Sequence, residues 1–244
     1  MYKDSIQSIR NLIFPIFQFG AKLNYGVLGT GFFIDEEGHF LTAAHVIDAL
    51  PEKSVLSYLG NIPDTSKTLK NPVPIKIINK DGSKDLALGK IEHRILPPVP
   101  FAPEAAKVGE SITLCGYPFP NIKKTSEVRT GNKLSINLDV SQVRQYWQPT
   151  VKIDIVQKGT FYRKSFDSFI TQDASLPGMS GGPIFNLSGE LVGVTSANAT
   201  RQIPRNKFPL TIENGIGVEL SEVKLFIDQS LSYSMRNLDI DLMI

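Results

Sequence analysis

One serine of the chain lies in an unusual run of glycines. The ten residues LPGMSGGPIF (176–185) place Gly178, Gly181 and Gly182 around Ser180, directly before a β-prone apolar segment. Glycine loses the most backbone entropy on folding, so a cluster of it indicates a backbone whose conformation or close approach excludes side chains. A serine hydroxyl is a weak nucleophile until a base lies within hydrogen-bond reach. Ser180 is therefore either a turn residue or a nucleophile, and the histidines decide between the two.

Three histidines are present, and only one has a setting suited to a base. His39, in the polar turn segment DEEGHF, and His93, at the end of the strand-like KIEHRIL, are both expected to be solvated. His45 follows an alternating apolar hairpin that ends in the small residues TAA (42–44), which leave room for an imidazole ring to be packed and aimed. A lone histidine beside apolar residues is more often a core residue, but this context favours a base.

Two aspartates compete to orient that histidine, in the segment NKDGSKDLALGK. Asp81 is followed by Gly82, and an Asp-Gly pair is typical of a turn. Asp85 directly precedes the apolar strand-like run LALGKI, where a carboxylate can be shielded from solvent and directed at a partner. We therefore expect Asp85, not Asp81, to be the orienting acid.

The blocks around these three residues resemble those of a known family. GTGFFID and LTAAHVI around His45, KDLALGKI around Asp85 and GMSGGPIF around Ser180 resemble the catalytic blocks of trypsin-like serine proteases, in the same chain order. The HtrA/Deg branch is the most similar, through VGESITLCGYPFP, GELVGVTSA and NGIGVELS. The resemblance spans about residues 26–221 and implies an all-β fold with two six-stranded β-barrels of the chymotrypsin type.

The resemblance also implies a mechanism without a cofactor. Ser180 attacks the scissile carbonyl, His45 takes and returns its proton, and Asp85 fixes the tautomer and stabilises the imidazolium. The product is an acyl-enzyme that water resolves. The oxyanion hole falls on Gly178, Met179 and Ser180, with the amides of Gly178 and Ser180 directed at the developing charge.

The walls of the pocket for the P1 side chain are assigned by the same resemblance. Glu219 or Asp173, if partly buried there, would favour Lys or Arg at P1, whereas HtrA-type pockets usually prefer small aliphatic residues, and both alternatives stay open. Period-two alternation places Gly217 and Glu219 on one face of the last strand. The expected pocket residues are Asp173, Ala174, Ser175, Thr195, Ser196, Ala197, Gly217 and Glu219.

Met179 departs from the family pattern. Secreted enzymes carry an aspartate there, which pairs with a new N-terminus after zymogen cleavage, and HtrA-type enzymes often carry asparagine. A methionine cannot form that ion pair, so the loop 171–177 must be ordered by packing, by substrate or by a partner. The expected function is a serine endopeptidase; the alternative is a catalytically silent pseudoprotease that acts as a peptide- or partner-binding β-barrel module. No PDZ-like segment is recognised after the peptidase blocks, so the HtrA peptide-sensing module is expected to be missing.

Short β-type runs dominate the chain, as in an all-β sandwich or barrel. The proline-rich stretch RILPPVPFAPEAAKVGE (94–110) lacks backbone donors at its prolines and suits a connector between two β-halves. We expect a single peptidase domain over residues 1–244, divided into an N-terminal barrel at about 20–93, a connector at 94–106, a C-terminal barrel at about 107–220 and a helix at about 221–233 capped by Ser221.

Composition excludes several classes of partner and cofactor. The 244 residues carry a formal charge of +2 and no dense basic run interleaved with aromatics, so we expect no nucleic-acid partner. The only cysteine, Cys115, cannot form an intramolecular disulfide and lies in an apolar strand, typical of a buried small hydrophobe rather than a nucleophile. Scattered histidines offer no metal-ligand spacing, so neither a metal nor another cofactor is expected.

The first twenty residues hold a six-residue apolar core broken by Pro15. That segment fits neither a signal peptide nor a membrane span, so we expect a cytoplasmic protein that does not bind a membrane. The expected partner is a protein or peptide substrate, and a regulatory protein partner is left open. The oligomeric state is not predicted.

Overall fold

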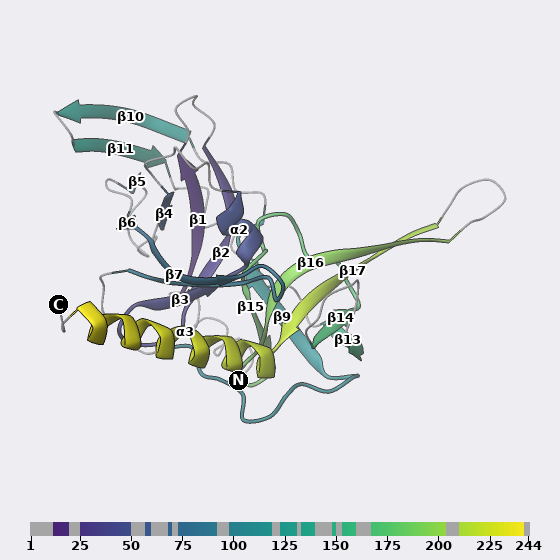
Figure 1. The fold of residues 1–244 in the computed structure, drawn as a ribbon. Helices are drawn as coiled ribbons and strands as arrows, with labels where there is room; N and C mark the ends of the chain where they lie inside the picture. The colour runs from purple at the N-terminus through teal and green to yellow at the C-terminus, as the bar shows by residue number, and fades with distance from the viewer. Residues whose placement is uncertain are drawn as a thin grey trace.

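The computed structural model is built mostly of β-strands. It describes residues 12–19, 25–49, 57–59, 68–69, 73–91, 98–118, 123–130, 133–139, 148–149, 153–159, 167–203 and 210–241. The strands form two seven-stranded sheets and one three-stranded sheet, and a long helix, α3, closes the chain (Figure 1).

The N-terminal sheet has the strand order β6-β4-β1-β2-β3-β8-β7, with every pair antiparallel. Its core is aromatic: the ring of Phe14 lies 4.8 Å from that of Phe33 and 5.4 Å from that of Phe40. Its first strand begins at Ile13, before residue 20, where the sequence placed the start of this half. The strands are β1 (Ile13–Phe19), β2 (Tyr25–Phe33), β3 (His39–Thr42), β4 (Ser57–Leu59), β6 (Val73–Pro74), β7 (Lys76–Asp81) and β8 (Leu86–Lys90).

The C-terminal sheet closes into a six-stranded barrel. Strand β9 pairs with β13 on one side and with β15 on the other, which joins the two ends of the order β9-β13-β14-β17-β16-β15. This closure confirms one of the two predicted barrels. In the N-terminal sheet the end strands β6 and β7 do not pair through described residues, so that sheet is open. The strands are β9 (Ser111–Gly116), β13 (Ile153–Gly159), β14 (Ser168–Thr171), β15 (Pro183–Asn186), β16 (Leu191–Ile203) and β17 (Leu210–Glu219), with β12 (Gln148–Pro149) added beside β9.

Two further segments join the halves. In the connector, the Val99 N–H donates to Phe33 O of β2. The next residue, Pro100, accepts at its carbonyl oxygen from the Leu191 N–H of β16, 2.7 Å away. A three-stranded sheet pairs β5 (Thr68–Leu69), from the N-terminal half, with the hairpin of β10 (Lys123–Thr130) and β11 (Lys133–Asp139).

Helix α3 (Leu220–Asp241) packs across both halves. It begins directly after β17, contacts β16 and β17, and runs back along β8 and β7 (Figure 1). Val223 and Phe226 of this helix are buried. The helix is longer than the expected span 221–233, and because it begins at Leu220, Ser221 lies within its first turn rather than at the cap.

Candidate active site

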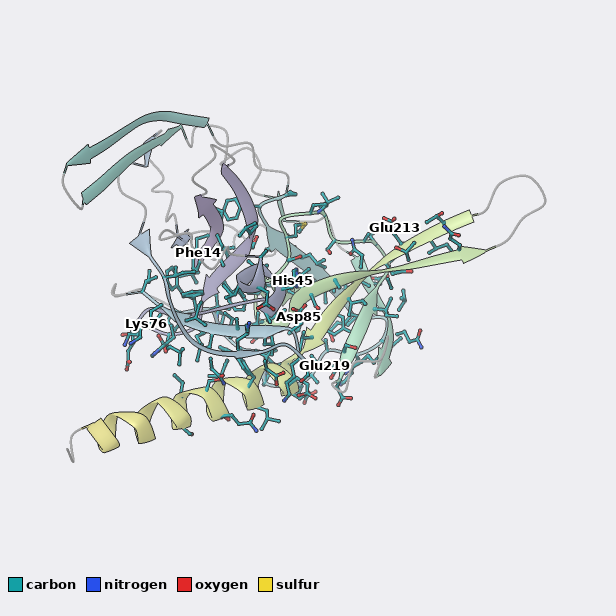
Figure 2. The ribbon with its side chains drawn as sticks, turned by 45° about the horizontal axis from the view of Figure 1, so that its top comes forward. Phe14, His45, Lys76, Asp85, Glu213 and Glu219 are labelled. Carbon is teal, nitrogen blue, oxygen red and sulfur yellow. The ribbon has the colours of Figure 1, made fainter. Side chains whose placement is uncertain are left out.

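His45 and Asp85 are brought together from different elements of the N-terminal sheet. His45 lies in the short helix α2 (Ala44–Asp48), and Asp85 lies between β7 and β8. His45 Nδ1 is 2.9 Å from Asp85 Oδ1 and 3.0 Å from Oδ2, and the His45 backbone N–H donates to Oδ1 at 3.1 Å (Figure 2). The N-cap residue Ala43 has no side-chain cap, so Asp85 supplies the acceptor for a free amide of the first turn while it holds the ring.

Asp85 has a backbone conformation that few residues accept. Its φ is +57°, the only positive φ among the described non-glycine residues. Aspartate tolerates this left-handed region better than most side chains. The carboxylate is buried, at 6% exposed, and Ser196 Oγ on β16 donates to its Oδ2. The N-terminal sheet and the C-terminal barrel therefore both fix the direction of this carboxylate.

The hydrogen bonds decide the charge of Asp85. Burial raises its pKa, but the hydrogen bonds from His45 and Ser196 outweigh burial, so the pKa of Asp85 lies below its ordinary value of 3.8. The carboxylate is therefore ionised at neutral pH and can only accept hydrogen bonds. His45 must then present a protonated Nδ1 to Asp85, which leaves Nε2 as the ring's free acceptor.

This lowered pKa predicts a specific loss of stability in acid. Because the folded state favours the ionised form, the contribution of Asp85 is complete above pH 3.8 and is lost as the pH falls through the lower folded-state pKa. We expect the free energy of unfolding to fall less between pH 7 and pH 3 in Asp85→Asn than in the unsubstituted protein. Urea unfolding at the two pH values measures this difference, and equal losses in both proteins would contradict the assignment.

Asp81, the competing aspartate, is a turn residue. Its Oδ1 accepts hydrogen bonds from the backbone amides of Ser83, at 2.8 Å, and Lys84, at 3.1 Å. This is the local side-chain-to-backbone pattern of an Asx turn. The contacts of Asp81 are thus within its own turn, whereas Asp85 reaches forty residues back to His45.

An ion pair supports the turn that carries Asp85. Lys84 Nζ lies 2.8 Å from Glu222 Oε2 in the first turn of α3, and both side chains are 17% exposed. Glu222 Oε1 also accepts the backbone N–H of Asp167, ahead of β14. Helix α3 thereby connects the strained turn to the C-terminal barrel.

We expect Glu222→Gln to lower the free energy of unfolding by about 1–3 kcal/mol, because it leaves Lys84 partly buried without its counter-charge. The amide oxygen of glutamine can still accept from Asp167, which isolates the effect of charge. Glu37→Gln is the matched control, since Glu37 is 73% exposed and 3.8 Å from Lys90, and exposed pairs contribute little. Urea unfolding compares the two variants, and equal midpoints would refute a role for the Lys84–Glu222 pair.

His39 forms a second histidine–aspartate pair, away from Ser180. It is 8% exposed, and its Nδ1 lies 2.5 Å from Asp35 Oδ2. The expectation of a solvated His39 is therefore wrong, because Asp35 in the same hairpin accepts both its ring and its backbone N–H. His93 lies outside the described residues.

The glycines around Ser180 have the conformations that their pattern indicates. Gly178 has a φ of +96° and Gly181 a φ of +80°. The Met179 N–H donates to Leu176 O at 3.0 Å, which closes a four-residue turn with Pro177 in its second position and Gly178 in its third. A positive φ in the third position defines a type II turn, and it requires glycine there.

Close contacts exclude side chains from the same loop. A Cβ on Gly181 would lie 2.2 Å from Thr42 Oγ1 on β3, and one on Gly182 would lie 2.1 Å from Cys115 O on β9. Across from them, a Cβ on Gly29 would lie 2.8 Å from Ser180 O. The Ser180 loop therefore lies tightly packed between the N-terminal sheet and the C-terminal barrel, beside the elements that carry His45.

Packing and hydrogen bonds order this loop. Met179 is fully buried, which gives the residue a role in the core in place of the ion pair that it cannot form. Ser180 O accepts from Thr30 N at 2.8 Å, and Gly181 N donates to Thr195 O at 2.7 Å. Of the three alternatives left open by the sequence, packing is the one that these contacts support.

Two asparagines brace the segment before Ser180, a role that the sequence did not predict for either of them. Asn198 Oδ1 accepts from Ser175 N and Ser175 Oγ, at 2.8 and 2.7 Å, and its Nδ2 donates to Ser175 O at 2.7 Å. Asn214 Nδ2 donates to Thr171 O at 2.9 Å and to Gln172 O. The signal that could have pointed to these two residues is their position within strand-like runs, because asparagine is disfavoured in β-strands.

The expected pocket residues lie in different environments. Glu219 is 8% exposed, and its Oε1 lies 2.9 Å from Lys158 Nζ on β13, so its charge has a partner. A Cβ on Gly217 would lie 2.5 Å from the core ring of Phe169. Asp173 is exposed. Of the remaining residues, Ser175, Thr195 and Ser196 are buried, and Ala174 and Ala197 are partly buried.

Cys115 is unsuited to nucleophilic chemistry. It is fully buried in β9, and burial strongly raises the pKa of its thiol, which disfavours the thiolate. Within the described ranges, no three His, Cys, Asp or Glu side chains are grouped to hold a metal ion. No helix in the same ranges is long and apolar enough to span a bilayer.

Known proteins share both the sequence pattern and the fold. Residues 29–194 match the family model of the trypsin-like peptidase domain. The chain is 31% identical, over 176 residues, to a probable periplasmic serine endoprotease DegP-like of Pseudomonas fulva, and 29% identical over 197 residues to that of Ectopseudomonas mendocina. These matches cover 71% and 80% of this chain but 30% and 34% of the relatives, so the chain spans about a third of their length.

Solved structures support the fold. The HtrA-type protease AlgW with a decapeptide aligns with a TM-score of 0.65 and 15% identity, over 95% of this chain and 68% of that one. Rv3671c from M. tuberculosis H37Rv, in an inactive form, aligns with a TM-score of 0.56 and 19% identity, over 93% and 90% of the two chains.

The comparisons correct the expected location. The matched relatives are named periplasmic endoproteases, which contradicts a cytoplasmic location. A single cysteine could not discriminate, since the lack of a disulfide is compatible with either compartment. The relatives in sequence are named DegP-like serine endoproteases, and the structures that share the fold include HtrA-type proteases. With a family model matched over residues 29–194, the chain belongs to the trypsin-like peptidases.

Proposed function

We propose that the chain is a serine endopeptidase in which Ser180 is the nucleophile, His45 the general base and Asp85 the orienting acid. The observation that carries the proposal is the contact between the buried Asp85 carboxylate and both the ring and the backbone of His45. No other described aspartate combines burial, a partner from the second barrel and a histidine whose side chain is 49% exposed. About half of this side chain is therefore at the surface, where a substrate can reach the site.

The first chemical step forms the acyl-enzyme. Nε2 of His45 accepts the Ser180 hydroxyl proton as Oγ attacks the carbonyl carbon, and the ionised Asp85 stabilises the imidazolium. The carbonyl oxygen becomes an oxyanion that the amides of Gly178 and Ser180 receive. Neither amide donates to a backbone carbonyl of a described residue, so both are available for this role. His45 then protonates the leaving amine, and water attacks the ester by the reverse sequence.

A silent peptide-binding module is less consistent with the site. Such a module would result if the Ser180 loop could not form the oxyanion hole, but the loop has a type II turn at Gly178 and a buried Met179. The relatives that the chain matches are named endoproteases. Both observations favour turnover.

The experiment that tests this function measures cleavage of fluorescently labelled, unfolded casein. We expect the purified chain to release peptides and Ser180→Ala to release none above background. Ser188→Ala is the matched control, because Ser188 is exposed in the turn after β15 and should cleave at the unsubstituted rate. Intact casein with the unsubstituted chain, or equal cleavage by Ser180→Ala, would contradict the proposal.

We further propose small aliphatic P1 residues, because neither acidic side chain offers a buried, unpaired charge to a P1 cation. Glu219 is neutralised by Lys158, and Asp173 is exposed to solvent. A P1-scanning peptide library is expected to show cleavage after Val, Ala or Leu, with the order of preference unchanged in Glu219→Gln and Asp173→Asn. A preference for Lys or Arg that either variant abolishes would show an acidic pocket instead.

A further inference from the structure

Every polar atom of Thr30, on β2, forms a hydrogen bond where the N-terminal sheet meets the C-terminal barrel. Its amide donates to Ser180 O at 2.8 Å, and its hydroxyl donates to Gly178 O at 2.7 Å. The hydroxyl also accepts from Tyr117 N at 3.2 Å, and Thr30 O accepts from Thr42 Oγ1 at 2.8 Å. The residue is fully buried, so solvent cannot replace any of these partners.

Two of these bonds act on peptides of the Ser180 loop. The peptide between Gly178 and Met179 is held at its oxygen by the Thr30 hydroxyl and at its nitrogen by Leu176 O. The peptide after Ser180 is held at its oxygen by the Thr30 amide. Types I and II turns differ by rotation of the central peptide, here the one that carries the Gly178 N–H. Holding the next peptide at both its oxygen and its nitrogen restricts the Gly178 backbone angles, and this restraint opposes the rotation that would turn the Gly178 N–H away.

The remaining bonds extend to the base and to the second barrel. Thr42, which donates to Thr30 O, is the last residue of β3 and lies three positions before His45. Tyr117, which donates to the Thr30 hydroxyl, directly follows β9. One buried residue thus connects the strand leading to His45, the loop carrying Ser180 and the C-terminal barrel.

We propose that Thr30 is a positioning residue whose hydroxyl holds the Ser180 loop in the type II turn that presents the Gly178 amide to the oxyanion. The inference rests on the proposed endopeptidase function. Valine has the same shape as threonine but cannot donate to Gly178 O, whereas serine keeps the hydroxyl and loses only a methyl group. The pair Thr30→Val and Thr30→Ser therefore separates hydrogen bonding from packing.

The test measures inactivation by a fluorophosphonate, whose phosphoryl oxygen takes the place of the oxyanion. In Thr30→Val we expect the maximal rate constant, kinact, to fall by about 10- to 100-fold, below the loss seen when a donor is deleted outright, while the half-saturating concentration stays within about twofold. Thr30→Ser is expected to restore kinact to within about threefold of the unsubstituted protein. Thr30→Ala replaces Thr30→Val if the latter does not fold.

Ser230→Ala controls for the general loss of a buried hydroxyl. Ser230 Oγ donates to Phe226 O in α3 and accepts from Asn79 on β7, far along the chain from the Ser180 loop. This variant should lower the urea midpoint without lowering kinact. Unchanged kinact in Thr30→Val, or equal loss in Thr30→Val and Thr30→Ser, would overturn the proposal.

Hydrogen exchange gives a readout that does not depend on activity. Mass spectrometry of the segment 175–182 should show faster exchange in Thr30→Val than in Thr30→Ser, because the peptide that carries the Met179 amide is no longer held at its oxygen and the turn opens more often. Equal exchange in the two variants would overturn the positioning role. Absence of fluorophosphonate labelling in the unsubstituted chain, with this exchange difference intact, would overturn the endopeptidase function instead.

Discussion

Replacing His45 by alanine is expected to lower kcat by about 10⁶-fold, the scale on which loss of the base alone abolishes a coupled serine–histidine site. Without an acceptor at Nε2, the Ser180 hydroxyl keeps its proton and is a poor nucleophile. The substitution also removes the ring that Asp85 contacts at 2.9 Å. Steady-state cleavage of a peptide that the unsubstituted chain cuts measures the effect, with KM expected to change little.

His39→Gln is a matched control for this loss. His39 also places Nδ1 against an aspartate, Asp35, but at the hairpin between β2 and β3 and without the Ser196 contact that Asp85 has. We expect this variant to lose stability, because His39 is buried, and to keep its kcat. A large loss of kcat in His39→Gln, with His45→Ala still active, would show that His45 is not the base.

Asp85→Asn is expected to lower kcat by about 10³- to 10⁴-fold. An asparagine can still accept the His45 backbone N–H, so α2 keeps its cap and the fold is retained. Its amide group, however, can donate to Nδ1, which favours the tautomer with the proton on Nε2. The ring then presents a donor to Ser180 rather than an acceptor. Loss of the negative charge also removes the stabilisation of the imidazolium.

Asp81→Asn separates the two aspartates of the same segment. Asp81 contacts the amides of Ser83 and Lys84, which an asparagine oxygen can also accept, so kcat should stay within about twofold. Cleavage of the same peptide, with circular dichroism as a check on folding, compares the variants. If Asp81→Asn is the damaging change and Asp85→Asn is harmless, the acid is misassigned.

Local patterns in the sequence predicted the parts of the site that local chemistry determines. The glycines at 178 and 181 have positive φ values because a type II turn and close backbone contacts require them, and glycine is recognisable in the sequence for that reason. Asp81 was separable from Asp85 because an Asp-Gly turn can be recognised from adjacent residues. Strand-like runs likewise predicted the strands of the closed C-terminal barrel.

Contacts between distant segments could not be predicted in the same way. Thr30 gave no signal in the sequence, because its importance depends on a carbonyl 148 residues away. The pairing of Glu219 with Lys158 depends on the barrel bringing β13 and β17 near each other. For His39 the prediction itself was wrong. Its polar turn predicted an exposed side chain, but the ring is buried and contacts Asp35 in the same hairpin.

The most direct test of the account is labelling by a fluorophosphonate probe followed by peptide mapping of the modified residue. We predict one adduct, on Ser180, formed by the unsubstituted chain at neutral pH. The adduct should be lost in Ser180→Ala and strongly slowed in His45→Ala and Asp85→Asn. An adduct on another residue, or no adduct from a folded chain, would contradict the claim that Ser180 is a nucleophile activated by His45 and Asp85.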